Sequence, residues 1–299
     1  MISILAIFAS THAYEVALTF DDLPASGDEF PIKSRTVIAH EIMATLKKHK
    51  IVGVYGFVTG VLAKNMAERL AILEEWKKNG FLIGNHTFSH KALNSVSAPE
   101  FITDIEANEP ILADFAKSIE EYKVLRFPYL EEGETQEKRY ELRSYLVRRH
   151  YQIAQVTMDF EDWAFGPPFI RCAVKDDTAS LKKLRDLFLD AASKRITHSL
   201  RLAEKIYGAK RIQHILLLHF SAATSEYLDS LLTQLETSGA RFISLTEAMK
   251  DGIYQQDSTY TGKIGKNFII QNRETRHLNF PSLPDLQIDR EELANFCQK

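Results

Sequence analysis

Val16-Ala17-Leu18-Thr19-Phe20-Asp21-Asp22 sets the architecture expected for this chain, because an apolar run ends there directly at two adjacent carboxylates. A short run of this composition predicts a buried strand. Asp21 and Asp22 would then stand at the carboxyl end of that strand. In barrel enzymes built from parallel strands, catalytic side chains gather at this end. The ends of the other predicted strands are therefore the places to look for chemistry.

Four further segments place polar side chains within or after apolar runs. They are His86-Thr87-Phe88-Ser89-His90, Arg126-Phe127-Pro128-Tyr129, Asp159-Phe160-Glu161-Asp162-Trp163 and Leu216-Leu217-Leu218-His219. Together with the two aspartates they supply carboxylates, imidazoles and a guanidinium, the groups that a metal-dependent hydrolytic site needs. No single segment is decisive, but their order and composition together indicate such a site.

Apolar runs alternate along the chain with stretches of helical spacing. The predicted strands cover 16–20, 51–58, 81–84, 124–125, 153–156, 212–218 and 241–243. The predicted helices cover 34–46, 62–79, 97–115, 134–149, 178–206 and 224–237, with a short one from Thr246. This alternation predicts βαβ units and a parallel sheet. With about seven such units, the expected fold class is α/β, a distorted parallel (β/α)7-type barrel with a C-terminal extension.

The barrel is expected over residues 14–250, because residues 251–299 are polar and irregular and break the alternation. We expect this last part to pack on the barrel as an extension, with a possible strand at 267–271 and a helix from Asp289. The chain has two cysteines, Cys172 and Cys297. An even count suits one disulfide in an exported protein, which would join the last helix to a mid-chain loop. Two unrelated free thiols are the alternative.

The net charge of −3 gives no basic footprint, so nucleic acid is not an expected partner. No apolar run approaches the length of a membrane span. The apolar stretch 2–9 followed by Thr11-His12-Ala13 resembles the back half of a signal peptide cut after Ala13, although its charged front is missing. Residues 1–13 are therefore expected to be a signal-peptide remnant and the protein an exported, periplasmic or extracellular monomer. A buried first strand is the alternative for this stretch.

His86 and His90 are candidate metal ligands. Four residues apart on a helical turn, their imidazoles would lie on one face. Zinc accepts such nitrogens, and a third ligand from elsewhere in the chain would leave one position open for catalysis. Residue 87 is threonine where the zincin protease motif requires glutamate, which disfavours a protease of that type. Pairs at this spacing also occur without any metal.

Asp21 and Asp22 can divide the labour, one binding a metal and the other accepting a proton, since adjacent side chains at a strand end point in different directions. The plainer interpretation is a turn in which one aspartate caps the next helix. Arg126 could keep such a carboxylate ionised and oriented, although an arginine at a strand end is more often a surface ion-pair partner. Phe127-Pro128-Tyr129 restricts the backbone and could aim an amide N–H at an oxyanion.

His219 ends an apolar run that would not tolerate an unpaired imidazole. A carboxylate partner such as Asp162 would raise its pKa and let it donate a proton to a leaving amine. The neighbouring Trp163 is either core or a sugar-stacking surface. His214 lies earlier in the same run without such a companion, and we assign it a structural role.

Taken together, the five segments closely resemble the polysaccharide deacetylases of the NodB-homology type, carbohydrate esterase family four. The family motifs T-F-D-D, H-x-x-x-H, R-x-P-Y, D-x-x-D-W and L-x-H all occur here in the family's order, between residues 19 and 219. The resemblance covers the predicted barrel and not the tail.

This resemblance implies a role for each matching residue. Asp22, His86 and His90 would hold the metal, usually zinc. Asp21 would be the general base, oriented by Arg126, and His219 the general acid, tuned by Asp162. The backbone amide of Tyr129 would help bind the oxyanion, Leu217 would line the pocket for the acetyl methyl, and Trp163 would wall the substrate groove.

The implied activity is removal of N-acetyl groups from a polysaccharide containing N-acetylglucosamine, with peptidoglycan the first candidate and chitin-type oligomers the second. Acetyl-xylan esterase, cyclic-amide hydrolase and a non-catalytic glycan-binding module are the alternatives. Two departures from the family bear on the sugar preference. Leu23 and Leu130 stand where the family usually has glycine, and both are expected to add bulk beside the site.

Overall fold

The computed structural model describes residues 14–27, 30–208, 211–279 and 288–298. The expected signal-peptide remnant at 1–13 lies outside these residues. Seven strands are found among them: β1 Tyr14–Leu23, β2 Tyr55–Val58, β3 Leu82–Asn85, β4 Val124–Leu125, β5 Gln152–Ile153, β6 Gln213–His219 and β7 Ala240–Ile243. All strand pairs in this part of the chain are parallel, in the order β5-β4-β3-β2-β1-β6. The predicted parallel α/β architecture is confirmed.

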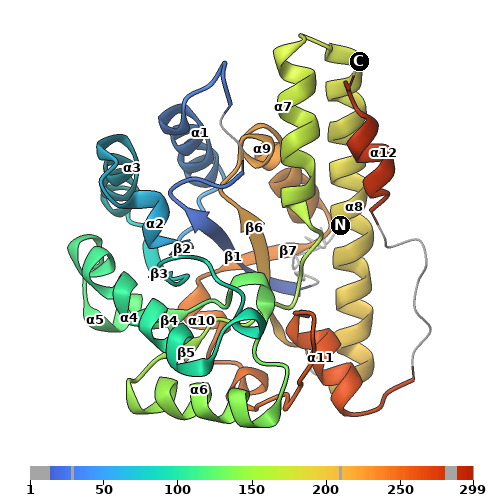
Figure 1. Ribbon diagram of the computed structural model, residues 1–299. Helices are drawn as coiled ribbons and strands as arrows, with labels where there is room; N and C mark the ends of the chain where they lie inside the picture. The colour runs from blue at the N-terminus through green and yellow to red at the C-terminus, as the bar shows by residue number, and fades with distance from the viewer. Residues whose placement is uncertain (1–13, 28–29, 209–210, 280–287, 299) are drawn as a thin grey trace, which may run out of the picture.

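The sheet curls toward a ring because the segment after β5 returns to β6. Met158 forms a parallel bridge with Leu216, and the amide of Leu217 donates to the carbonyl of Met158 at 3.0 Å. Strand β7 pairs with the first residues of β1, and β2 pairs with the later residues of β1 on the same edge. Figure 1 shows the strands at the centre with helices around them.

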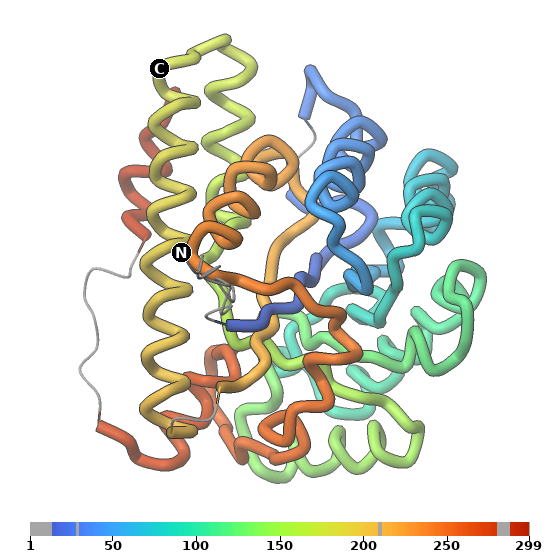
Figure 2. Tube along the Cα trace, turned by 180° about the vertical axis from the view of Figure 1, so that it is seen from behind, coloured from blue at the N-terminus to red at the C-terminus, as the bar shows by residue number. Residues whose placement is uncertain are grey.

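Helices cover the outside of this ring (Figures 1 and 2). They are α1 Arg35–Lys48, α2 Gly60–Ala63, α3 Ala67–Lys78, α4 Ala98–Phe115, α5 Ile119–Tyr122, α6 Gln136–Arg148, α7 Gly166–Val174, α8 Thr178–Tyr207, α9 Ala222–Thr237, α10 Leu245–Ala248, α11 Phe268–Thr275 and α12 Arg290–Asn295. Helix α4 starts with the capping box expected at Ser97 and Glu100. Helix α7 was not predicted, and the predicted helix 62–79 is divided into α2 and α3. No helix in the described ranges combines the length and apolar character needed to span a membrane.

The alternation of side chains along β1 explains how the strand serves both the core and the site. Val16, Leu18 and Phe20 pack in the largest apolar cluster, together with residues of the surrounding helices. Ala17 points the other way, into a cluster with Tyr55, Phe57 and other strand residues, and Asp21 continues on that side. A single strand therefore anchors the helical layer and carries a carboxylate toward the interior of the ring.

The C-terminal residues hold two helices against the rest of the chain. Helix α11 packs on α8, and its first amide, that of Phe268, donates to the carbonyl of Val156 at 2.7 Å. Helix α12 runs along α8 in both views (Figures 1 and 2) and contacts α7, and the disulfide Cys172–Cys297 joins α7 to the residues just after α12. Of the two possibilities that the sequence left open, the structure has the disulfide and not two free thiols, and Cys172 lies in a helix and not in a loop.

One predicted element is wrong. The segment 267–271 was expected to be a strand because Phe268, Ile269 and Ile270 are apolar and partly β-branched. It is instead the start of α11, since the Asn267 side chain accepts the amide of Ile270 and caps a helix. The helix expected from Asp289 is confirmed as α12, capped by that residue.

Candidate active site

Strand register brings the predicted residues together at the carboxyl ends of the strands. Asp21 of β1 lies directly opposite His219 of β6. Asn85 of β3 lies opposite Leu125 of β4, and the amide of Arg126 donates to the carbonyl of Asn85 at 2.9 Å. His86 and Arg126 therefore follow two adjacent strand ends.

Asp22, His86 and His90 form a cluster whose ligand atoms all lie within 4.8 Å of one another. The Asp22 Oδ1 atom is 3.3 Å from His90 Nε2 and 3.7 Å from His86 Nε2. Asp22, the residue after the inward-facing Asp21, adopts φ 62°, a conformation that aspartate tolerates better than most residues.

The segment 86–90 is an irregular loop, so the helical turn assumed for the two histidines is wrong. Thr87 and His90 have φ 64° and 55°, which a helix does not allow. Side chains hold the loop instead. The amide of Thr87 donates to Asn85 Oδ1 at 2.8 Å, and the Ser89 hydroxyl donates to Asp104 Oδ1 at 2.6 Å. The two imidazoles still converge, with ring centroids 4.8 Å apart.

His86 suits a divalent metal in its tautomer and protonation state as well as in its position. His86 Nδ1 lies 2.8 Å from the carbonyl of Arg126, and an N–H there directs the lone pair of Nε2 toward Asp22. Burial lowers the pKa of His86 to about 3, so its imidazole is neutral at neutral pH, the form that binds metal. One carboxylate and two imidazoles match the three protein ligands of catalytic zinc sites.

Asp21 is buried and faces a buried guanidinium. Arg126 Nη1 donates to Asp21 Oδ1 at 3.0 Å, Nη2 donates to Thr19 Oγ1, and Nε donates to the carbonyl of Ala154. The Arg126 side chain is 1% exposed, which excludes the surface role considered for it. Burial raises the pKa of the Asp21 carboxyl, and the charge and hydrogen bond of Arg126 oppose that rise.

His219 has the carboxylate partner expected for it. Its Nδ1 is 2.7 Å from Asp162 Oδ1, and its amide donates to Asp162 Oδ2, which also accepts from Thr224 Oγ1. Asp162 is fully buried. Burial disfavours the imidazolium, but the charge of Asp162 and its hydrogen bond prevail and raise the pKa of His219 to about 10.

Tyr129 and Leu130 form a turn beside the metal cluster, both with positive φ, at 57° and 56°. The Tyr129 ring packs edge-on against His90, and both turn residues line the cavity described next. Leu130 thus adds bulk beside the site, as expected. Leu23 does not: it is fully buried, and its side chain packs over Gly56 in β2.

One cavity of about 790 Å³ is lined by Asp21, Asp22, His86, His90, Tyr129, Leu130 and His219. Trp163 and Leu217 line it as predicted. Further lining residues were not assigned from the sequence: Asp159, Glu161, Arg195, Ile264, Gly265, Lys266, Asn267, Ile270 and Arg290. Asp159 and Glu161 lie inside a recognised motif and could have been singled out from it. The residues of the extension carried no signal.

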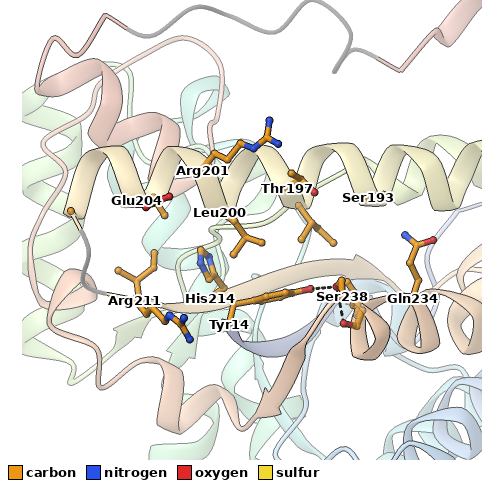
Figure 3. A pocket seen from close by; sticks show the side chains of 15 residues that line it. Tyr14, Ser193, Thr197, Leu200, Arg201, Glu204, Arg211, His214, Gln234 and Ser238 are labelled. Atoms are coloured by element: carbon orange, nitrogen blue, oxygen red, sulfur yellow. Dashed lines mark hydrogen bonds between the residues drawn. The ribbon is translucent and has the colours of Figure 1, made fainter. Parts of the chain in front are cut away.

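A second cavity of about 540 Å³ lies toward the opposite end of the strands (Figure 3). It is bordered by α8 and by Tyr14 and His214, near the amino ends of β1 and β6. The Tyr14 hydroxyl is 2.9 Å from Ser238 Oγ, and His214 Nδ1 is 3.3 Å from Thr157 Oγ1. None of the motif residues lines this cavity.

Comparison with known proteins identifies the family to which the chain belongs. A family model described as polysaccharide deacetylase matches residues 9–148. A curated relative, the peptidoglycan-N-acetylglucosamine deacetylase of Bacillus cereus, is 30% identical over 234 residues, which cover 77% of this chain and 66% of the relative. The chain belongs to the polysaccharide deacetylase family. It spans about two thirds of the length of this relative.

Solved structures of other polysaccharide deacetylases and their kin share the fold. A family-four carbohydrate esterase pseudoenzyme from Bacillus anthracis aligns with a TM-score of 0.53 at 17% identity, over 81% of this chain and 67% of that chain. A polysaccharide deacetylase from Bacillus cereus aligns with a TM-score of 0.51 at 20% identity, over 77% of this chain and 91% of that chain. The predicted (β/α)7-type barrel is thereby confirmed, while identities this low carry no conclusion on activity.

Proposed function

We propose that this polysaccharide deacetylase family member is a metal-dependent hydrolase that removes N-acetyl groups from a glycan containing N-acetylglucosamine. One observation carries the proposal. The Asp22–His86–His90 cluster shares a cavity with Asp21 and His219, a carboxylate and an imidazole at paired positions of two adjacent strands.

Asp22, His86 and His90 would hold the metal, and zinc is the ion that best matches one carboxylate and two imidazoles. When bound, the cation supplies Lewis acidity to the acetamide carbonyl and acidity to water. Because Asp21 and Asp22 are adjacent, the carboxylate of Asp22 would bind the metal while that of Asp21 accepts a proton.

Asp21 accepts the proton of the water that attacks the carbonyl carbon. Arg126 fixes the orientation of Asp21 through its hydrogen bond to Oδ1 and offsets the tendency of burial to protonate it. The backbone amide of Tyr129 donates to the oxygen on which negative charge develops, an interaction often worth about 3–4 kcal/mol in the transition state.

His219 donates a proton to the nitrogen of the leaving amine as the carbon–nitrogen bond breaks, giving acetate and a free amino sugar. Asp162 keeps the imidazole protonated and oriented. A cation held by Asp22, His86 and His90 would offset part of the negative charge that faces His219. Leu217 would contact the acetyl methyl and Trp163, which is 43% exposed, would contact the sugar.

Peptidoglycan is the first candidate substrate, because the curated relative is a peptidoglycan-N-acetylglucosamine deacetylase. Chitin-type oligomers come second, and acetylated xylan and cyclic amides are alternatives on the same fold. A non-catalytic glycan-binding module is a further alternative, and one of the solved structures with this fold is described as a pseudoenzyme. The complete set of metal, base and acid groups in one cavity favours the enzyme.

We propose that the protein acts as a monomer outside the cytoplasm, in the periplasm or beyond the cell, where such a substrate would be met. The disulfide Cys172–Cys297 supports this location, because disulfides persist in oxidising compartments.

The test is release of acetate. Zinc-loaded protein incubated with N-acetylglucosamine oligomers or peptidoglycan should release acetate, and chelation should abolish the release. Asp21→Asn should lower the rate by roughly 10²–10⁴-fold while zinc remains bound. Undiminished turnover by metal-loaded Asp21→Asn would refute the role of that carboxylate. Release of acetate from acetylated xylan alone would identify xylan as the substrate. If no glycan released acetate, the non-catalytic glycan-binding module would be the remaining alternative.

A further inference from the structure

The C-terminal extension reaches into the cavity that holds the motif residues. Ile264, Gly265, Lys266 and Asn267 all line it, although α9, β7 and α10 separate them in the chain from the last motif residue, His219. This short segment, 264–267, connects residues 251–263 to helix α11 and is called the strap below.

The strap is fixed to the barrel on both sides. Before it, Asn94 Nδ2 donates to the carbonyl of Gly262 at 3.0 Å. After it, the amide of Phe268 donates to the carbonyl of Val156 at 2.7 Å, and Gln271 Nε2 donates to Glu132 Oε1 at 2.9 Å. These contacts hold the strap at a set distance from the turn 129–130.

Gly265 is the point of closest approach. A Cβ atom built on Gly265 would overlap the carbonyl oxygen of Tyr129 and would lie 2.6 Å from the carbonyl carbon of Leu130. Both are backbone atoms, so no flexible side chain could move aside. The strap and the turn are therefore packed backbone against backbone, which only glycine permits at this position.

The turn needs such support because its conformation is unfavourable for its residues. Tyr129 and Leu130 have φ 57° and 56°, a region that costs free energy for side chains without a local polar partner. The Tyr129 side chain is 60% exposed, so its burial does little to fix the turn. The turn's own hydrogen bonds, Leu130 N–H to Phe127 and Glu131 N–H to Pro128, are 3.1 and 3.2 Å long.

We propose that Gly265 is a positioning residue for the reaction, which holds the Tyr129 amide in the direction needed to bind the developing oxyanion. This inference rests on the proposed deacetylase function. It assigns the extension a part in catalysis, whereas all the motif residues lie in the barrel.

The test compares Gly265→Ala with Gly252→Ala. Gly252 lies in the same extension, and a Cβ built there meets nothing within 4 Å. Gly265→Ala should lower kcat for acetate release by about tenfold to a hundredfold, a fraction of the loss known for deleting an oxyanion donor. KM and zinc affinity should stay within about twofold of wild type, because neither the sugar contacts nor the metal ligands change. Gly252→Ala should match wild type in all three.

Hydrogen exchange supplies a readout that is independent of activity. Amides of the peptide 127–131 should exchange faster in Gly265→Ala than in wild type, with peptides of α4 and α9 unchanged. Should Gly265→Ala fail to fold, Asn94→Ala loosens the strap without adding bulk. It should produce the same acceleration of exchange and a smaller fall in kcat.

Wild-type kcat and unchanged exchange at 127–131 in Gly265→Ala would overturn the inference. So would a loss of zinc or a general acceleration of exchange, since these indicate a structural role only. If wild type releases no acetate from any glycan, the proposed function fails, and the exchange data alone then judge whether the strap holds the turn.

Discussion

His219 and His214 lie five positions apart on β6 and have opposite environments. His219, at the carboxyl end, is hydrogen-bonded to the buried carboxylate of Asp162, and its pKa is raised to about 10. His214, near the amino end, has a hydroxyl as its nearest partner, and burial lowers its pKa to about 4. One strand thus carries a charged imidazole at one end and a neutral one at the other.

The difference follows from the architecture of parallel strands. At the carboxyl ends, the loops after β1, β3, β4 and β6 converge, so side chains far apart in sequence can meet there. At the amino ends the strands are met by α8 and α9, and the described residues that line the cavity there include one acid, Glu204, and one histidine, His214 (Figure 3). The position of a histidine along the strand therefore decides whether its imidazole has charged partners.

Replacing each histidine in turn is the strongest test of this comparison. His219→Ala should lower kcat for acetate release by roughly 10²–10⁴-fold, because the leaving amine loses its proton donor. His214→Asn should keep kcat within about threefold of wild type, since it lies at the far cavity. Zinc content should be equal in both, as neither residue belongs to the metal cluster. A large loss of kcat in folded His214→Asn would mean that the two ends are not functionally separate.

Stability against pH should separate the two histidines by sign. The folded-state pKa of His214 lies below its ordinary value of 6.5, so the stability it confers is full above pH 6.5 and is lost as the pH falls toward 4. The folded-state pKa of His219 lies above 6.5, so its contribution is full below pH 6.5 and is lost as the pH rises through about 10.

Urea unfolding at pH 7 and at pH 5 measures how much stability is lost as His214 is protonated. Titration of His214 should lower the free energy of unfolding of wild type by about 2 kcal/mol from pH 7 to pH 5. His214→Asn should lack this part of the decrease. At pH 7 and pH 9, His219→Ala should show the weaker decline with rising pH. Equal pH slopes in wild type and His214→Asn would show that this imidazole is not held neutral by burial.

The carboxyl end of the barrel could be predicted from sequence because each motif residue follows an apolar run. Asp21, His86, Arg126 and His219 needed only the parallel register to become neighbours. The role of Leu23 could not be predicted, because adjacent positions on a strand point in opposite directions and the sequence does not say which one faces the groove. Its burial over Gly56 places it in the core.

Local conformations were harder to predict than the meeting of the strands. The loop 86–90 depends on Asp104, a distant side chain in α4, and no spacing rule contains that contact. The strand predicted at 267–271 failed because one capping asparagine outweighs three apolar residues. The contact of Gly265 with the turn at Tyr129 joins segments without any shared pattern.

Replacing the partner of His219 tests why its pKa is raised. Asp162→Asn removes the charge that favours the imidazolium, so the pKa of His219 should fall. As a general acid, His219 must be protonated, and the basic limb of the kcat–pH profile should move to lower pH. At a pH above that limb, kcat should fall by roughly tenfold. A profile with an unmoved basic limb would show that the limb belongs to another group.

The smallest effect concerns two arginines of the extension that stack on aromatic rings at opposite ends of the barrel. Arg290 lies over the Trp163 ring at 4.9 Å, in the cavity of the motif residues, and Arg276 lies over Tyr207 at 5.3 Å. Arg290 covers a ring that would otherwise be open to a sugar. Arg290→Gln should therefore lower KM for N-acetylglucosamine oligomers by about twofold to fivefold, since an exposed stack of this kind is worth about 0.5–1 kcal/mol.

Arg276→Gln is the matched control and should leave KM unchanged, because Tyr207 does not line that cavity. The kcat of both variants should equal that of wild type. A rise in KM for Arg290→Gln would mean that the guanidinium binds the sugar and does not compete with it. In either case the response should be confined to the carboxyl end of the strands, where the extension and the barrel share one cavity.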